Sequence, residues 1–535
     1  MPSRSSGSVA GWLEAAASGV RLLSGLPRFL RLATTTERAA AELRARRAAR
    51  RDAVASAIRR ASEAHATPYP LLLRAAGLVP EDAERLVQQS GIEHALTELL
   101  DRGVCLSVQE LTGRAAVVRR GHVVQDAARL SSSRKRAGPW TSSSGSRVGA
   151  RVVPVDFAFL AERAIDDRLL LEARGGLHWE HAVWEAPGGG LLTILRYARC
   201  GATPHRWFSP VDPRTPGLGP RYRWSAAFVR LSNLMAGARL PRLEVVPIAS
   251  PGPVLDWMRA VLRRGGTPHL DTFVTPALRL AHAARAAGAD LSGARFTVVG
   301  EPITQARRRT LESTGAEVLP TYRTAEAGAI GIGCLAPAVA DEVHVLDDLV
   351  AVIPNSLSGR LDQARARTLF VTSLRPRAPM MLLNAALGDE AVIGHRACGC
   401  PLEALGWTTH LHSIRGVDKL TAAGMTFLDV DLVRVLDELL PARFGGGPTH
   451  YQLVEDESDD GQPILRLLVD PALGRVDAEA VRDAFLDAIG AGPGSARIMA
   501  LHWRASGLPR VQRHVPVIGR TGKILHLHQG RRLQP

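Results

Sequence analysis

The chain of 535 residues is poor in lysine, in cysteine and in long apolar runs. Only Lys135, Lys419 and Lys523 stand among 67 basic residues, so arginine carries nearly all of the positive charge. A GC-rich genome explains this skew most simply. A lysine that is retained despite this skew marks a position where arginine cannot replace it. The charge of arginine is spread over a planar fork, whereas that of lysine sits on a compact ammonium group.

The scarcity of cysteine argues against a disulfide framework, because the thiols are few and unevenly spaced for a chain of this length. The five cysteines are Cys105, Cys200, Cys334, Cys398 and Cys400. We therefore expect a reducing compartment and a cytoplasmic protein. The chain has no run of 18 apolar residues, and charged side chains interrupt the apolar stretch at residues 11–33. The sequence thus predicts no transmembrane segment and no signal peptide.

The charge balance is strongly basic, with a net charge of +15 and an isoelectric point of 10.6. Such a balance suits an anionic partner, and nucleic acid is one reading. The arginines are spread along the chain rather than gathered with aromatic residues in a recognisable module, so we rank that reading last and expect no nucleic-acid partner. The contents of 46% hydrophobic and 22% charged residues are ordinary for a globular protein.

Composition along the chain predicts three regions. Residues 1–130 begin with helices rich in Ala, Leu and Arg, which we expect to pack on the next domain; contact with a membrane surface is the alternative. A loop rich in serine and glycine opens residues 131–414, where apolar strands alternate with helices, the order typical of an α/β sheet. Residues 415–535 mix strands and helices before a basic tail, which indicates a separate small α+β domain.

Within the middle region, residues 295–322 predict a compact unit of strand, helix and strand. FTVVG reads as the first strand, ITQARRRTLESTG as the helix and EVLPTY as the second strand. The ends of such strands are where open α/β sheets place ligand-binding loops, here VVGEPI and TYRTAEAG. Upstream, the apolar segments LLTILRYA and LEVVPIA are predicted as further strands.

Five short segments, taken in chain order, resemble the adenylate-forming ligases and, within them, the phenylacetate-CoA ligase-like branch. They are TSSSGSRVGAR at Thr141–Arg151, VVGEPIT at Val298–Thr304, TYRTAEAG at Thr321–Gly328, LGDEAVI at Leu387–Ile393 and GRTGKI at Gly519–Ile524. The resemblance implies an α/β fold: a large adenylate-forming core carrying a helical N-terminal extension, followed by a small, mobile C-terminal α+β domain.

The resemblance also implies a role for each segment. The serine- and glycine-rich segment lets backbone amides approach phosphate oxygens, and the GEPI backbone lies against adenine. Glu326 holds Mg²⁺, Asp389 and Arg415 meet the ribose, and Lys523 neutralises the charge that develops as a carboxylate attacks the α-phosphate. The implied catalytic residues are Lys523 and Glu326. The implied nucleotide-binding residues are Ser142, Ser143, Ser144, Gly145, Ser146, Gly300, Glu301, Pro302, Tyr322, Arg323, Thr324, Asp389 and Arg415.

The sequence departs from the family pattern at several positions. The phosphate segment lacks the usual lysine and threonine-glycine pair, which leaves Arg147 as its nearest cation. Arg323 stands where the family has glycine, Ala385 and Ala386 replace an aromatic and a basic residue, and Val417 replaces the hinge aspartate.

One group of residues points to a metal rather than to a nucleotide. Cys334, His344, Cys398 and Cys400 include a C-x-C pair, and thiolate with imidazole is the ligand set that Zn²⁺ prefers in closed sites. Buried free thiols are the alternative from the residues alone. Some members of the resembled branch are similar in holding a structural zinc between these segments. A fifth thiol, Cys200, is expected to be a small buried side chain rather than a nucleophile.

The leading hypothesis is an AMP-forming acid–thiol ligase that uses ATP and Mg²⁺ to activate a small-molecule carboxylic acid. Coenzyme A is the default acceptor by resemblance, and a carrier protein or an amine stays open. The second hypothesis is a degenerate adenylate-forming fold that binds a ligand or a partner without turnover, motivated by the altered phosphate segment. The sequence leaves the carboxylate and the oligomeric state open, a homodimer included.

Overall fold

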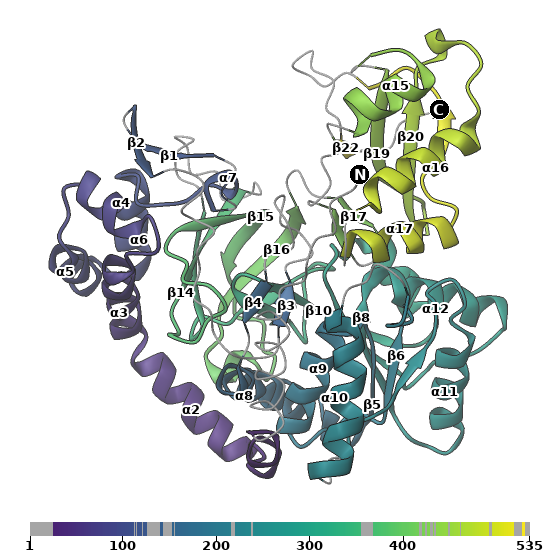
Figure 1. The fold of residues 1–535 in the computed structure, drawn as a ribbon. Coiled ribbons are helices and arrows are strands. Elements are labelled where there is room, and N and C mark those ends of the chain that lie inside the picture. Colours follow the sequence, from purple (N-terminus) through teal and green to yellow (C-terminus); the bar gives the residue numbers. More distant parts are fainter. Residues whose placement is uncertain are drawn as a thin grey trace.

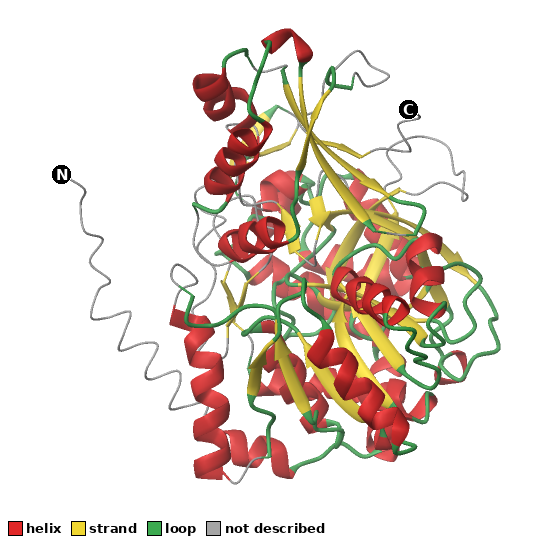
Figure 2. Ribbon diagram, turned by 90° about the vertical axis from the view of Figure 1, so that its right-hand side faces the viewer, coloured by secondary structure: helices red, strands yellow, loops and turns green. Residues whose placement is uncertain are grey.

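A mixed sheet of 12 strands dominates the described part of the chain, with a second, four-stranded sheet near the C-terminus (Figures 1 and 2). The computed structural model describes residues 25–125 except 112, 114 and 120; 140–142; 152–154; and 156–416 except 216–219, 237–238 and 355–366. Beyond these it describes residues 420–422, 425–427, 432, 435–447, 450–460, 462–491, 495–517 and 527–529. The α/β class expected from the sequence is confirmed.

The described N-terminal region consists of helices followed by a hairpin. A representative start signal is Pro80 in the first turn of α5, followed by the acidic Glu81 and Asp82, a pattern that suits a helix N-terminus. The elements are α2 (Thr36–Ala48), α3 (Arg50–Glu63), α4 (Tyr69–Ala75), α5 (Pro80–Ser90), α6 (Ile92–Asp101), α7 (Val108–Leu111), β1 (Val117–Arg119) and β2 (His122–Gln125). Figure 1 shows these helices as a purple and blue row along one side of the molecule.

Six neighbouring strands of the large sheet are parallel and lie in the order β7-β6-β5-β8-β9-β10. They are β5 (Glu180–Trp184), β6 (Arg206–Ser209), β7 (Leu243–Val245), β8 (Pro268–Phe273), β9 (Arg295–Val299) and β10 (Glu317–Thr324). The chain leaves β5 toward β6 on one side and later returns to β8 on the other. The direction of winding therefore reverses between β5 and β8, and open α/β sheets bind ligands beyond the carboxyl ends of the strands at such a point.

Helices connect and cover these parallel strands (Figure 1). They are α8 (Phe157–Ala173), α9 (Gly189–Arg199), α10 (Pro220–Ala236), α11 (Gly252–Arg263), α12 (Val274–Ala286) and α13 (Gln305–Glu312), with the 3₁₀ turn η2 at Gly176–His178. The predicted unit of strand, helix and strand is confirmed as β9, α13 and β10. The prediction of a strand for LLTILRYA is wrong, because this segment forms α9. A helix buried on nearly all sides has the same continuous apolar pattern as a buried strand.

The other half of the large sheet is antiparallel, in the order β10-β11-β12-β16-β15-β14-β13. The strands are β11 (Gly328–Gly333), β12 (Val343–Val345), β13 (Val350–Pro354), β14 (Arg367–Ser373), β15 (Ala385–His395) and β16 (Thr409–Gly416), with a 3₁₀ turn η3 at Glu403–Leu405. A continuous apolar core joins these strands to α2–α6, including Leu43, Ile58, Leu96 and Trp407. The described N-terminal helices share buried side chains with this half of the sheet.

The C-terminal region forms the four-stranded sheet β21-β20-β19-β22, covered by helices. Its elements are β19 (Tyr451–Glu457), β20 (Pro463–Val469), β21 (Arg510–Arg513), β22 (Leu527–Gln529), the π-helical turn η4 (Val435–Leu439), α15 (Leu440–Phe444), the 3₁₀ turn η5 (Pro471–Leu473), α16 (Ala478–Ile489) and α17 (Ser495–Ala505). Hairpin β17–β18 (Leu420–Ala422 and Met425–Phe427) precedes it, and hairpin β3–β4 (Trp140–Ser142 and Val152–Pro154) lies upstream of α8.

Contacts tie this C-terminal sheet region to the parallel strands. Thr310 of α13 donates its hydroxyl to the backbone oxygen of Asp460 at 2.6 Å, and Val211 packs against Ile498 of α17. Figure 1 shows α17 between the yellow sheet and the teal core. No helix among those described is long and apolar enough to cross a membrane.

Candidate active site and candidate metal centre

The candidate nucleotide residues meet where the parallel half of the sheet joins the antiparallel half. Strand β10 is parallel to β9 and antiparallel to β11, and its last three residues are Tyr322, Arg323 and Thr324. Tyr322 donates its hydroxyl to Oδ2 of Asp389 at 2.8 Å. Burial and this neighbouring carboxylate raise the pKa of Tyr322 well above its usual value, so the phenol stays a hydrogen-bond donor. The Asp389 side chain is thereby fixed in orientation.

The loop after β9 packs tightly beneath this junction. Gly300 has a φ of +84°, and a Cβ atom there would lie 2.5 Å from the ring of Phe273, so only glycine fits. Glu301 turns inward: its two carboxylate oxygens accept hydrogen bonds from the backbone N–H and the hydroxyl of Thr275, at 2.9 and 2.6 Å. The Glu301 carboxylate therefore fixes the loop, and the backbone of Gly300 to Pro302 remains the part suited to a planar base.

Glu326 and Arg415 approach the same junction from two other directions. Glu326 lies in the turn between β10 and β11, and its charge contributes to the raised pKa of Tyr322. Arg415 is an exposed residue of β16, which pairs with β15 so that Asp389 faces Gly416 and Glu390 faces Arg415. The structure thus brings together the candidate residues of β10, β15 and β16.

Five other candidate residues are not described. The phosphate residues Ser143, Ser144, Gly145 and Ser146 and the candidate catalytic Lys523 lie outside the described residues. Ser142 ends strand β3, which pairs with β4.

Arg323 points away from Asp389 into a buried network of charges. Its guanidinium group lies 3.7 Å from a carboxylate oxygen of Asp167 in α8 and 3.9 Å from one of Asp271 in β8. Arg196 of α9 lies 3.4 Å from Asp167, and Tyr197 donates its hydroxyl to Asp271 at 3.1 Å. Burial raises the pKa of Asp271 and lowers that of Arg323, so the network is held by mutual pairing.

Sequence reasoning missed this network. Its members come from α8, α9, β8 and β10, and no spacing within one segment relates them. A signal was present only for Glu185, which follows the apolar strand β5 and precedes three glycines in WEAPGGG. An acidic residue at a strand end before a glycine run is a pattern worth testing as a binding loop.

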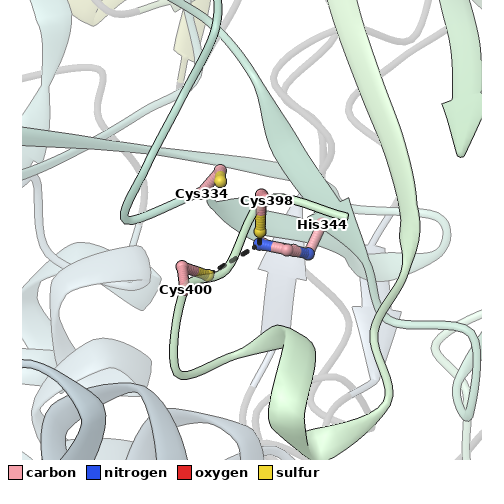
Figure 3. A group of neighbouring side chains, drawn as sticks. All are labelled: Cys334, His344, Cys398 and Cys400. Atoms are coloured by element: carbon pink, nitrogen blue, oxygen red, sulfur yellow. Dashed lines mark hydrogen bonds between the residues drawn. The ribbon is translucent and has the colours of Figure 1, made fainter. Parts of the chain in front are cut away.

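The four candidate metal ligands lie together, as Figure 3 shows. Cys334 follows β11, His344 belongs to β12, and Cys398 and Cys400 lie in the connection from β15 to β16. Nε2 of His344 is 3.2 Å from the sulfur of Cys400 and 3.7 Å from that of Cys398, and all four ligand atoms lie within 4.8 Å of one another. A tetrahedral zinc ion with ordinary bond lengths separates its ligand atoms by about 3.3–3.8 Å, so the donor set fits that ion.

The tautomer of His344 also suits a metal. Its Nδ1 lies 2.6 Å from the backbone oxygen of Trp407, so that nitrogen donates its proton there and leaves the lone pair of Nε2 facing the thiols. Burial lowers the pKa of His344 to about 4, which keeps the ring neutral at physiological pH. A neutral imidazole with a fixed outer hydrogen bond is the usual form of a histidine ligand.

The backbone around Cys400 favours the thiolate form of its side chain. Burial acts to raise its pKa, but the backbone N–H groups of Leu335, Glu403 and Leu402 outweigh burial and lower the pKa below the ordinary thiol value. Burial raises the pKa of Cys334 to about 12. Burial also raises the pKa of Cys398.

The surroundings of the cluster supply charge and rigidity. Arg396 donates to the sulfur of Cys334 at 3.6 Å and forms an ion pair with Glu342 at 2.8 Å. On the other side, Trp407 donates its indole N–H to Asp348 at 3.3 Å, and Asp348 lies 3.3 Å from the guanidinium group of Arg46 in α2. This chain of contacts connects the cluster to the N-terminal helices.

Cys200 and several aromatic and histidine side chains of the parallel half of the sheet lie in the interior. Cys200 is fully buried and donates its thiol to the backbone oxygen of Ala164 at 3.3 Å, and burial raises its pKa well above the usual value. This confirms the expectation that Cys200 is a small buried side chain. Trp184 and Trp207 are fully buried core residues. His181 and His269 form a buried pair whose Nδ1 atoms are 2.8 Å apart.

No protein-family model matches the chain, and no curated protein sequence matches it. Among solved structures, the chain is similar to a mutant amide bond synthetase from Marinactinospora thermotolerans, with 14% identity and a TM-score of 0.35 over 72% of this chain and 95% of that one. It is similar to an AMP-forming acyl-CoA synthetase/AMP-acid ligase II-like protein from Dyadobacter fermentans, with 12% identity and a TM-score of 0.30 over 72% and 86%. It is also similar to the o-succinylbenzoate CoA synthetase of Bacillus subtilis, with 11% identity and a TM-score of 0.39 over 76% and 74%.

Proposed function

We propose that this protein is an ATP-dependent ligase that activates a carboxylic acid as its acyl-adenylate and then passes the acyl group to a thiol. The observation that carries the proposal is the hydrogen bond from Tyr322 to Asp389, two residues that are far apart in the sequence and come from two motifs of the adenylate-forming ligases. The glycine loop at Gly300 lies beside the same strand end. Three of the five resembling segments thus converge at one edge of the sheet.

The proposed first step forms a bond between a carboxylate oxygen and the α-phosphorus of ATP and breaks the bond to pyrophosphate. Asp389 accepts hydrogen bonds from the ribose hydroxyls, because Tyr322 holds its carboxylate in place, and Arg415 meets the nucleotide from β16. Lys523 neutralises the charge that develops at the α-phosphate; a compact ammonium suits this role, and lysine is rare in this chain. Glu326 would hold Mg²⁺, which neutralises the phosphate oxygens.

In the proposed second step, a thiolate attacks the acyl carbonyl carbon and AMP leaves. Coenzyme A is the acceptor that we propose, in line with the phenylacetate-CoA ligase-like branch, and a carrier-protein thiol or an amine would use the same adenylate. We also propose that the C-terminal region, which carries Lys523, moves between the two steps, so that the lysine leaves the site before thiolation.

The cluster of Cys334, His344, Cys398 and Cys400 is proposed as a structural zinc centre. Four protein ligands would leave no open position for water or substrate, which is the arrangement of structural rather than catalytic zinc. The four ligands would fix the connection between β15 and β16. Both of these strands carry candidate nucleotide residues.

The test is release of pyrophosphate from ATP and Mg²⁺ with a panel of aryl and aliphatic carboxylic acids, comparing the wild-type protein with Lys523→Ala. We expect acid-dependent release that falls at least about 100-fold in the variant, the size typical of losing one transition-state contact. Lys419→Ala serves as the matched control.

The second candidate function is a non-catalytic binding protein of the same fold. It is favoured by the partly buried Arg323, which fills a position where the adenylate-forming ligases have glycine and whose charge is already paired with Asp167 and Asp271. Absence of pyrophosphate release with every acid, together with absence of ATP binding by calorimetry, would select this function.

A further inference from the structure

Trp407 lies between the metal cluster and the N-terminal helices and connects the two. It belongs to the connection from β15 to β16, which also carries Cys398 and Cys400. Its backbone oxygen accepts the Nδ1 proton of His344 at 2.6 Å, and its indole N–H donates to Oδ1 of Asp348 at 3.3 Å. The Trp407 side chain is fully buried. One residue therefore joins a candidate metal ligand to the turn between β12 and β13.

Arginines of α2 and α3 bind the other side of this turn. Oδ2 of Asp348 lies 3.3 Å from the guanidinium group of Arg46, and the two side chains are 0% and 2% exposed. Beside this pair, Arg47 forms an ion pair with Asp347, and Arg50 donates to the backbone oxygen of Asp347 at 2.8 Å. The loss of one partner from a buried ion pair is costly, because it leaves an unpaired charge. The position of α2 and the position of the turn are therefore linked.

The connection that carries the cysteines also contacts α2 directly. Its turn η3 lies against α2. Gly406, which follows η3, has a φ of +98°, and a Cβ atom there would lie 2.7 Å from Nε of Arg47. Leu402 of the connection and Leu43 of α2 are buried in the same apolar core. A change in the position of this connection would thus disturb the packing of α2 as well as its ion pairs.

A metal ion in the cluster would fix the connection in this position. The connection spans residues 396–408, and η3 is its regular element. Bonds from Cys398 and Cys400 to a shared ion would tie it to Cys334 and His344. Ligation through Nε2 of His344 leaves the proton on Nδ1, the nitrogen that donates to Trp407. Because such a cluster is absent from the unfolded chain, the free energy of metal binding stabilises the folded arrangement around it.

Other contacts of the N-terminal helices are independent of the cluster. Arg60 of α3 donates to the backbone oxygen of Leu374, between β14 and β15, at 3.0 Å. The side-chain amide of Asn384 donates to the backbone oxygen of Leu96 in α6 at 2.8 Å. These contacts would remain without a metal ion. An effect of the metal should therefore be concentrated in α2 and absent from α6.

We propose that metal binding by the cluster holds helix α2 on the core, and that Trp407 and Asp348 couple the metal centre to Arg46. Such coupling is reciprocal: the metal stabilises the docking of α2, and the docking of α2 strengthens metal binding by the same factor. The inference rests on the metal centre proposed above and is independent of the ligase reaction.

The first experiment measures the affinity of the full-length protein for Zn²⁺ by competition with a chromogenic chelator. The variants are Arg46→Met, Trp407→Phe and the matched control Arg60→Met. All of them keep the four candidate ligands, and Trp407→Phe also keeps the backbone oxygen that accepts from His344. We expect Arg46→Met and Trp407→Phe to weaken Zn²⁺ binding by at least about 5-fold, the lower end for coupling between two sites. Arg60→Met should bind Zn²⁺ as the wild type does, because Arg60 contacts the core at Leu374 instead.

The second experiment measures amide hydrogen exchange with and without Zn²⁺, and its central comparison needs no variant. Removal of Zn²⁺ from the wild type should lower the protection of the α2 amides by at least about 5-fold and leave α6 unchanged. In Arg46→Met, α2 should exchange faster even with Zn²⁺ bound, and removal of Zn²⁺ should add little, because the coupling is already lost. Thermal melting of each variant confirms that it is folded.

The outcomes separate this inference from the proposals on which it rests. Unchanged Zn²⁺ affinity in folded Arg46→Met, or exchange of α2 that does not respond to Zn²⁺ in the wild type, would overturn the coupling and leave the metal centre in place. Wild-type protein that binds no Zn²⁺ would overturn both the centre and the coupling. The ligase is tested separately, by the release of pyrophosphate.

Discussion

Replacing Tyr322 by phenylalanine removes one oxygen atom and therefore isolates the contact on which the nucleotide site depends. Tyr322 donates to Oδ2 of Asp389 at 2.8 Å, and Asp389 is 8% exposed. A hydrogen bond to a charged group contributes about 1.5–3 kcal/mol, which corresponds to about 10- to 100-fold in an equilibrium constant. In the variant, the carboxylate loses the donor that orients it toward the ribose hydroxyls in the proposed site.

The assay is the initial rate of pyrophosphate release at varied ATP and saturating acid. We expect KM for ATP to rise by about 10- to 100-fold in Tyr322→Phe while kcat changes little, because ribose contacts contribute equally to ground-state and transition-state binding. Tyr451→Phe is the matched control. Tyr451 donates its hydroxyl to the backbone oxygen of Gly445 at 2.8 Å in the C-terminal sheet region, and its loss should leave KM for ATP unchanged.

A double-mutant cycle then tests whether Tyr322 acts through Asp389. If it does, Tyr322→Phe should have little further effect in an Asp389→Asn background, because the carboxylate that it positions is gone. Fully additive effects of the two substitutions on KM would refute the reasoning, and so would a fall in kcat at unchanged KM in Tyr322→Phe.

Two further predictions concern metal content and pH. Purified protein should contain about one zinc ion per chain, as measured by mass spectrometry of the metal. Cys398→Ser and Cys400→Ser should lose the zinc, and the control Cys200→Ser should keep it. Wild-type protein that is free of metal and has full thermal stability would exclude the zinc centre. Burial lowers the pKa of His181 to about 3. Below pH 6.5, the unfolded chain therefore binds a proton at this histidine that the folded chain does not bind. By pH 5, this difference lowers the free energy of unfolding by about 2 kcal/mol. The drop in melting temperature from pH 7 to pH 5 should be smaller in His181→Gln than in the wild type or in the exposed control His178→Gln, and equal drops in all three would contradict the assignment.

The elements that the sequence predicts well are those whose ends carry strong local signals. Strand β9, helix α13 and strand β10 were predicted because Gly300 and Gly315 end apolar or periodic segments. Helix α9 was mistaken for a strand, because LLTILRYA is apolar on nearly every side and its length alone does not separate the two forms. The glycines that flank this segment indicate neither a helix nor a strand.

In the candidate site too, the residues within short sequence motifs were predicted and those that meet only in the fold were not. Tyr322, Asp389 and the cysteine–histidine cluster were found from motifs, and the structure brings each set together. The charged network around Arg323 was not found, because its partners Asp167 and Asp271 come from α8 and β8, which lie far from β10 in the sequence. Long-range pairing of this kind leaves no pattern in one sequence.

The most direct test of the central claim is the transfer of oxygen from the acid to AMP. An acid that supports pyrophosphate release is labelled with ¹⁸O in its carboxylate group, and the AMP that is released is analysed by mass spectrometry. Attack of the carboxylate on the α-phosphorus predicts that each AMP carries one ¹⁸O atom, and that Lys523→Ala forms little of it. Unlabelled AMP, or ADP and phosphate as products, would contradict the formation of an acyl-adenylate by this protein.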